Sequence, residues 1–202
     1  MLICKRLQLA LKFCSIFLFL SLLAALSMPQ TASGQALELN GGWSHVTGDF
    51  GTDGYEVGAA WWFTKRLTLA GNYESTWDNS TLTAFQFSQA GATAVHTHLQ
   101  SVLLGPRVFF STDWTTKHKL NPFGEAEFGV SDLSQKVTQG GVTVSNSDNA
   151  FSWMIGGGAE YLLSPHWSAR GNLDLLRTHL ESQGQSRFRF VLGFTYTFGP
   201  RD

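Results

Sequence analysis

Two histidines stand at a spacing that a metal ion could use. In His96-Thr97-His98 both imidazoles would lie on one side of an extended strand, because side chains alternate between its two faces. A His-x-His pair alone is a weak signal for a metal site. The pair also falls where a loop is expected to meet a strand, and His45 and His118 have polar neighbours. We therefore expect solvated or interfacial histidines, and we predict neither a metal nor a cofactor.

Serine and histidine are also the residues of a nucleophilic enzyme, which needs a serine beside a placed histidine. The candidate pairs are Ser44 with His45 and Ser164 with His166. Neither pair belongs to a recognisable motif. The sequence therefore predicts that this chain is not an enzyme.

The elements that would position these residues are strands, and residues 187–198 show this best. Every even position of this segment holds a large apolar or aromatic side chain, whereas the odd positions hold Arg, Arg, Val, Gly, Thr and Thr. One face of the strand is thus apolar and the other polar. The length suits a bilayer, which a tilted strand crosses with about 9–11 residues. The pattern is typical of an outer-membrane β-barrel.

Seven further segments have the same two-faced character, and none shows a sustained helical period. The eight expected strands are Leu37–Val46, Tyr55–Thr64, Leu67–Trp77, His98–Phe110, Leu120–Val130, Ala150–Leu163, Trp167–Arg177 and Arg187–Phe198. An even number of strands is the rule for bacterial single-chain barrels.

The connections between these strands alternate in length. The short ones are Lys65-Arg66, Ser111–Lys119 and Ser164–His166; the longer ones are Thr47–Gly54, Asp78–Thr97, Ser131–Asn149 and the intermediate Thr178–Ser186. Short turns at one rim and long loops at the other describe an up-and-down membrane barrel. We expect an all-β fold, an eight-stranded antiparallel transmembrane barrel. The loop Asp78–Thr97, with apolar residues among polar ones, is either a sticky surface site or a projecting hairpin.

A soluble eight-stranded barrel of the lipocalin type is the structural alternative. It would carry lysine on its solvated strands, but Lys65, Lys117, Lys119 and Lys136 all fall in connections. The apolar faces instead carry aromatics near the strand ends, as the girdles of a membrane barrel do. Those toward the long loops are Trp43, Tyr55, Tyr73, Trp77, Phe151 and Trp153; those toward the short turns are Trp61, Phe63, Tyr161, Trp167 and Phe198.

The polar face of each strand should point into the barrel. The charged residues at this parity are Glu38, Glu56, Glu74, Arg107, Glu125, Glu127, Glu160, Arg170, Asp174, Arg187 and Arg189. An eight-stranded barrel is barely wide enough for side chains, so we expect these groups to pair across the lumen. Arg107, Glu125, Glu127, Arg170 and Arg187 are the candidates for one connected network. We favour a polar plug over a path for ions or solutes.

The N-terminal residues 1–36 have the features of a secretory signal peptide. Lys5 and Arg6 precede an apolar stretch, and small residues before and at Ala36 suit a cleavage site. An uncleaved transmembrane anchor is the alternative. Removal would take both cysteines, Cys4 and Cys14, so no thiol would remain for a disulfide, a metal or catalysis.

The mature chain, residues 37–202, should form one domain. Of 14 Lys and Arg residues, 11 would remain against 15 Asp and Glu, which gives a net charge of −4. A mildly acidic chain without a basic stripe offers nothing to nucleic acid.

These features together resemble the small outer-membrane β-barrel family typified by the transmembrane domain of outer-membrane protein A and by opacity-type surface proteins. The resemblance rests on the signal, the eight segments, Gly156-Gly157-Gly158 and the closing residues 194–198. It implies residence in the outer membrane of a Gram-negative cell and a structural or loop-presenting role. The implied partners are outer-membrane lipid, periplasmic chaperones, the barrel assembly machinery and an extracellular ligand of the long loops. A narrow pore and a lipid-modifying barrel enzyme are the alternatives.

We predict cleavage after Ala36 and recovery of the mature chain in the outer-membrane fraction. Intact-mass measurement of the purified protein checks the cleavage, and membrane fractionation checks the location. Protein found in the inner membrane with residues 1–36 still attached would refute the signal-peptide interpretation.

Overall fold

The computed structural model describes residues 36–47, 51–82, 93–111, 119–139, 142–179 and 184–199. The chain divides into two compact units, residues 1–33 and 34–202, and the account below concerns the second. The expected signal segment, up to residue 35, lies outside the described residues. In the part of the chain that is described, no helix is long and apolar enough to span a membrane.

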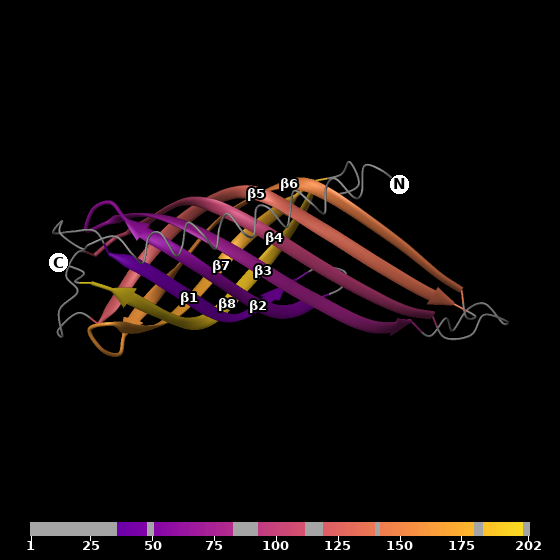
Figure 1. Cartoon of the computed structure of the whole chain (residues 1–202), viewed down its shortest axis with the longest axis horizontal. Helices are drawn as coiled ribbons and strands as arrows, with labels where there is room; N and C mark the ends of the chain where they lie inside the picture. The colour runs from indigo at the N-terminus through magenta and orange to yellow at the C-terminus, as the bar shows by residue number, and fades with distance from the viewer. Residues whose placement is uncertain are drawn as a thin grey trace. The chain divides into compact units, whose positions relative to one another are not determined.

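Eight antiparallel strands follow one another around a closed barrel (Figure 1). Their bounds are β1 Leu37–Val46, β2 Thr52–Trp62, β3 Leu67–Leu82, β4 Thr93–Phe109, β5 Leu120–Gln139, β6 Val142–Leu162, β7 Trp167–Thr178 and β8 Gln185–Phe198. Each strand pairs with the next, and β1 pairs with β8 from Leu37↔Phe198 to Val46↔Arg189. The predicted eight-stranded up-and-down barrel is confirmed.

Four strands are much longer than the sequence predicted. Half of the expected loop Asp78–Thr97 and nearly all of the expected loop Ser131–Asn149 are strand. β3 and β4 pair as far as Leu82↔Thr93, and β5 and β6 as far as Gln139↔Val142. These residues are polar but rich in Ser, Thr and Val. The backbone groups of these paired segments are hydrogen-bonded to the neighbouring strand, so the segments form strands although their side chains are polar. The longer connections proposed there were therefore wrong in extent.

The elongated strands form one continuous sheet beyond the barrel. β4 pairs with β5 out to Ala94↔Thr138, whereas β2 stops pairing with β3 at Asp53↔Trp77 and β7 stops pairing with β6 at Ser152↔Thr178. We call this four-stranded part of β3 to β6 the extension, and the rim that bears it the extension end (Figure 1). The opposite rim, with the bends at residues 63–66 and 163–166, is the turn end.

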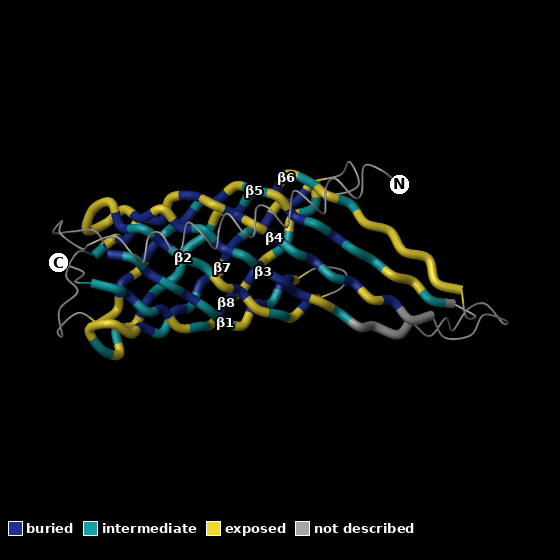
Figure 2. The backbone as a smooth tube through the Cα atoms, viewed as in Figure 1, coloured by how far each residue is buried: buried dark blue, intermediate teal, exposed yellow. Residues whose placement is uncertain are grey.

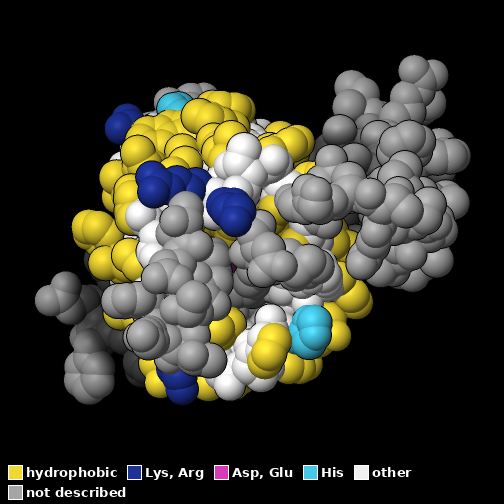
Figure 3. Space-filling view, turned by 90° about the vertical axis from the view of Figure 1, so that its left-hand side faces the viewer, with side chains coloured by type: hydrophobic (Ala, Val, Ile, Leu, Met, Phe, Trp, Pro, Cys, Tyr) yellow, Lys and Arg dark blue, Asp and Glu magenta, His cyan; other side chains and the backbone are white. Residues whose placement is uncertain are grey.

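Buried residues alternate with more exposed ones along the barrel strands (Figure 2), so one face of each strand points inward and the other outward. Seen from the turn end, apolar side chains cover much of the visible outer surface, and several basic side chains lie among them (Figure 3). The ten principal girdle residues, Trp43, Tyr55, Trp61, Phe63, Tyr73, Trp77, Trp153, Tyr161, Trp167 and Phe198, are all exposed or partly exposed. Their outward position results from strand parity, which follows directly from the sequence.

Inward-facing glycines let neighbouring strands approach closely. A Cβ at Gly105 would lie 2.0 Å from the carbonyl oxygen of Ala126, and one at Gly129 would lie 1.9 Å from that of Val102. No side chain fits at such distances, so glycine allows the sheet to bend tightly there. Glycine kinks of this kind help a sheet to close into a barrel.

The outer face of β8 provides a test of the bilayer position. Leu192 points outward and is 50% exposed. Leu192→Arg should destabilise the barrel by about 2–4 kcal/mol if the site lies near the bilayer midplane, because lipid cannot solvate the charge. Urea titration in lipid vesicles, followed by tryptophan fluorescence, measures the loss.

Val144→Arg is the matched control, since Val144 is 66% exposed on the extension. A surface substitution outside the bilayer should change the free energy of unfolding by no more than about 0.5 kcal/mol. Equal stability of Leu192→Arg and the parent protein would show that the outer face is not in contact with lipid at this height.

Candidate functional site: the barrel interior

Aromatic side chains form the interior layer nearest the turn end. Trp62, Phe109 and Phe123 are buried there with Ala36. The Trp62 ring stacks on Phe109 with centroids 4.7 Å apart, and Phe109 meets Phe123 at 5.5 Å. Trp62 and Phe109 are the last residues of β2 and β4, and Phe123 lies near the start of β5. Their packed rings form an apolar layer, and the indole Nε1 of Trp62 donates to Glu38 Oε2 at 3.1 Å.

A second apolar layer lies inside the barrel near the extension end, with buried residues such as Thr97, Ser101 and Ser131 between its members along the strands. Its buried members are Val46, Leu99, Leu103, Leu133, Met154 and Leu176. Strand parity predicted only polar groups in the interior and neither apolar layer. The available signal was β4, where apolar residues occupy both parities: Leu99, Leu103 and Phe109 share the inward face with Arg107.

Between these layers lies a charged zone, and Glu125 of β5 is one of its centres. Arg107 of β4 donates from Nε to Glu125 Oε2 at 2.8 Å and from Nη1 to Glu38 Oε1 at 3.2 Å. Arg170 of β7 donates from Nη2 to both oxygens of Glu125 at 3.2 Å. The two guanidiniums also stand 5.1 and 5.0 Å from the ring centroid of Phe123. Cation–π attraction therefore links the charges to the aromatic layer.

Arg189 of β8 is the second centre. Its Nη2 lies 2.8 Å from Asp174 Oδ2, and its Nη1 lies 2.7 Å from Glu56 Oε2 and 4.0 Å from Glu74 Oε2. Ser44 donates a further hydrogen bond to Glu74. One guanidinium thus holds carboxylates from three strands, which suits its planar fork of donors.

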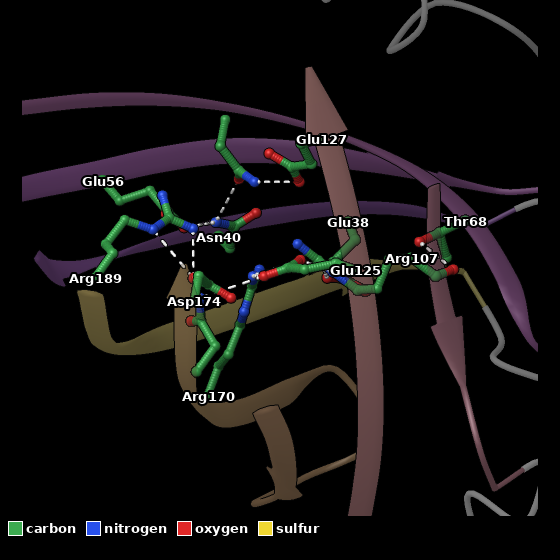
Figure 4. A network of polar contacts seen from close by, with 12 residues as sticks. Glu38, Asn40, Glu56, Thr68, Arg107, Glu125, Glu127, Arg170, Asp174 and Arg189 are labelled. Carbon is green, nitrogen blue, oxygen red and sulfur yellow. Dashed lines mark hydrogen bonds and ion pairs between the residues drawn. The ribbon is translucent and has the colours of Figure 1, made fainter. Parts of the chain in front are cut away.

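Asparagine side chains join the two centres into one network (Figure 4). Asn172 Nδ2 donates to Glu125 Oε1 at 3.3 Å and to Asp174 Oδ2 at 2.5 Å. On the other wall, Asn40 Nδ2 donates to Glu56 Oε1 at 3.1 Å and to Asn72 Oδ1 at 3.3 Å, and Asn72 Nδ2 donates to Glu127 Oε1 at 2.7 Å. These asparagines have inward parity, but the sequence analysis considered only charged groups.

We call this connected set the central network. Its members are Glu38, Asn40, Glu56, Asn72, Glu74, Arg107, Glu125, Glu127, Arg170, Asn172, Asp174 and Arg189. Within the described residues it brings together strands β1 to β5, β7 and β8, so it crosses the lumen in several directions. Such a network ties opposite walls of the barrel to one another.

Two of the charged groups predicted to lie inside the barrel, Glu160 and Arg187, are not members of the central network. Glu160 is buried and accepts a hydrogen bond from Ser168 at 2.9 Å. Arg187 differs from the other arginines of the predicted network, because it is partly exposed near the extension end and donates to Gln185. Three arginines, Arg107, Arg170 and Arg189, are fully buried with seven carboxylates. The interior thus carries more acidic than basic groups.

The serine and histidine pairs weighed from the sequence do not meet. Ser44 points inward, whereas His45 points outward and contacts Asp53 at 2.9 Å. Ser164 accepts a hydrogen bond from the Trp167 amide, and His166 contacts the Thr197 carbonyl oxygen at 3.0 Å.

His96 and His98 share the outer face of β4, and His98 meets Ser75 of β3. The pairing of His98 with Ser75 was missed because it depends on the register of two strands. In the described ranges, no cluster of three or more His, Cys, Asp or Glu residues could hold a metal ion.

Comparisons with known proteins agree with this architecture. The family model of the outer membrane protein beta-barrel domain matches residues 15–198. No curated protein is significantly similar to the chain in sequence. Among solved structures, Ail, the attachment invasion locus protein of Yersinia pestis, is 17% identical, with a TM-score of 0.56 over 83% of this chain and 100% of that one. Ail has also been solved in complex with the heparin analogue sucrose octasulfate.

Two proteins of Pseudomonas aeruginosa are similar as well. The outer membrane protein OprG is 10% identical, with a TM-score of 0.55 over 82% of this chain and 96% of that one. The N-terminal β-barrel domain of OprF is 18% identical, with a TM-score of 0.50 over 82% and 100%. At these identities the structures establish the fold alone. The family match covers most of the sequence, and this protein therefore belongs to the outer membrane protein beta-barrel domain family and resides in the outer membrane.

Proposed function

We propose that this protein is a non-conducting structural barrel of the outer membrane that presents its extension to the exterior. One observation supports this proposal most: the central network is buried between two apolar layers. A pore needs a continuous polar path that water can fill. Packed aliphatic and aromatic side chains at both ends oppose such a path, and the ion pairs between them hold the walls together.

The extension supports the second part of the proposal. In this family plan the termini and short turns face the periplasm, so the extension end faces the exterior. The strands β3 to β6 carry polar and small residues out from the membrane on a hydrogen-bonded scaffold, which fixes their positions better than free loops would. Outer-membrane lipid around the girdles, periplasmic chaperones and the barrel assembly machinery are the partners that this architecture requires.

We also propose that the extension binds an extracellular ligand, whose chemical class we do not specify. Ail was solved with a sulfated heparin analogue. Here, however, the described residues at the extension end mix Lys136, Arg177 and Arg187 with several aspartates. This mixture forms no basic surface that would attract a polyanion. We therefore do not extend that ligand to this chain.

The conductance of single molecules tests the plug. Wild-type protein in a planar lipid bilayer should give little or no steady current. Arg170→Ala should introduce brief openings, because it removes a guanidinium that contacts both Glu125 and the Phe123 ring. Arg177→Ala is the matched control, since Arg177 is an exposed arginine of the same strand, and it should stay silent. A large, stable current through the wild type would favour the narrow pore instead.

The stability of the network gives a second test. Arg189 is 0% exposed and holds Glu56, Glu74 and Asp174. Arg189→Met should lower the free energy of unfolding by about 3–5 kcal/mol, because buried carboxylates lose their partner. Denaturant titration in vesicles measures this change.

Arg187→Met on the same strand controls for the loss of an arginine. Arg187 is partly exposed, so its removal should cost no more than about 1 kcal/mol. If both variants were equally stable, the central network would contribute nothing to holding the barrel together.

A further inference from the structure

A serine and a histidine meet on the outer surface of the barrel, apart from the central network. Ser75 Oγ of β3 lies 2.9 Å from His98 Nε2 of β4. The register places Ser75 opposite Gln100 and Trp77 opposite His98, so the imidazole reaches diagonally back to the hydroxyl. With the proton on Nδ1, Nε2 accepts the hydrogen bond from Ser75. This is the contact that a general base makes with a serine nucleophile.

An aspartate lies on the other side of the histidine. Asp132 of β5 stands opposite Gln100, which makes it a diagonal neighbour of His98 on the same outer face. Diagonal side chains on one face of a sheet are within reach of each other. A carboxylate beside the histidine can orient the ring and stabilise its protonated form during a reaction.

Tyrosines supply a further group to this site. Tyr55 of β2 is the register partner of Ser75, and the rings of Tyr55 and Tyr73 lie 6.3 Å apart. A tyrosine hydroxyl at this position can donate to an oxyanion that forms at the serine. Tyr55 in turn contacts Trp77 at a ring distance of 6.0 Å, and Trp77 contacts His98 at 6.4 Å. The serine therefore lies within the aromatic girdle of the extension end.

The girdle position specifies the kind of substrate. Tryptophan and tyrosine belts mark the level of the lipid headgroups. The extension end faces the exterior, so this site faces the outer leaflet. At this depth the ester bonds that join acyl chains to lipid headgroups are the bonds that a nucleophile on the outer face would meet.

We propose that Ser75, His98 and Asp132 form a lipid-facing site that hydrolyses carboxylic esters of outer-leaflet lipids. Ser75 Oγ attacks the acyl carbonyl carbon and its proton passes to His98 Nε2. The ester carbon–oxygen bond breaks, and His98 returns the proton to the departing alcohol. Water then attacks the acyl-serine with His98 as base, the acyl–Oγ bond breaks, and the proton returns to Ser75. The products are a fatty acid and a deacylated lipid.

This inference departs from the prediction that the chain is not an enzyme. That prediction weighed only pairs that are close in sequence, whereas Ser75 and His98 are brought together by strand register. Ser75 is only 3% exposed, so access requires Tyr55 or Trp77, both nearly half exposed, to change rotamer. Exposed side chains make such changes within picoseconds to nanoseconds.

Labelling with a fluorophosphonate, which reacts with activated serines, tests the site in the intact protein. Folded wild type in detergent micelles should be labelled at Ser75, as identified by peptide mass spectrometry, and Ser75→Ala should not be. His98→Gln should react at least about 100-fold more slowly, since general base catalysis contributes about 10²–10⁴. Retained heat-modifiable gel mobility shows that each variant is folded.

Two further variants separate a positioning role from a structural one. Asp132→Asn should slow labelling, because it removes the carboxylate while nearly keeping the shape of the side chain. Asp132→Glu should restore part of the rate, because it supplies a carboxylate again. His45→Gln is the matched control: His45 contacts Asp53 at 2.9 Å on the same outer face, and its removal should leave the labelling rate unchanged.

Release of fatty acid from vesicles of native outer-membrane lipid, lipopolysaccharide included, tests the reaction itself. Mass spectrometry should detect release by the wild type and none by Ser75→Ala or His98→Gln. The proposal would be overturned if folded wild type stayed unlabelled at Ser75 or released no fatty acid. It would also be overturned if His98→Gln were labelled as fast as the wild type. None of these outcomes bears on the conductance of the barrel, so the proposed structural role would stand or fall separately.

Discussion

Closure of β1 against β8 is the constraint on which the rest of this structure depends. A hydrocarbon environment offers no hydrogen-bond partner to the backbone, so a sheet can cross it only when no edge is left unpaired. Eight strands close the sheet with the smallest lumen that side chains can fill. The ladder from Leu37↔Phe198 to Val46↔Arg189 meets this requirement. Everything placed inside the barrel must then find its partners among other side chains.

The interior shows how that requirement is met. Carboxylates outnumber guanidiniums, and each buried arginine therefore serves more than one acid: Arg107 holds Glu38 and Glu125, and Arg189 holds carboxylates of three strands. Asparagine amides complete the connections. Apolar clusters lie on either side of the ion pairs along the strands, and electrostatic attraction is stronger where water is excluded. Packing and charge thus reinforce each other.

The outer face of the barrel is in contact with lipid, so its side chains differ from those of the interior. Over most of its height the outer face is apolar, and the aromatic girdles mark where lipid gives way to water. Beyond the girdle, β3 to β6 continue as a sheet whose faces are both largely polar. The Ser75–His98 contact lies at the boundary between these regions, where polar chemistry and lipid ester groups share one depth.

The sequence by itself determined the architecture. Alternation of polar and apolar residues identified eight strands, their inward and outward faces and the position of Arg107, Glu125, Arg170 and Arg189 inside, because strand parity is a local property. The sequence also indicated the girdle aromatics, since their parity and distance from the turns are local as well.

Only the tertiary structure decided which groups meet. The links through Asn72 and Asn172, the stacking of Trp62 on Phe109, and the contact of Ser75 with His98 all depend on strand register and on the curvature of the closed sheet. Register is fixed by packing and turns across the whole barrel. The sequence offered a projecting hairpin for Asp78–Thr97 only as one of two alternatives and predicted no strand at 131–149. Exposed strands carry polar residues on both faces, so they lack the alternation by which strands are found.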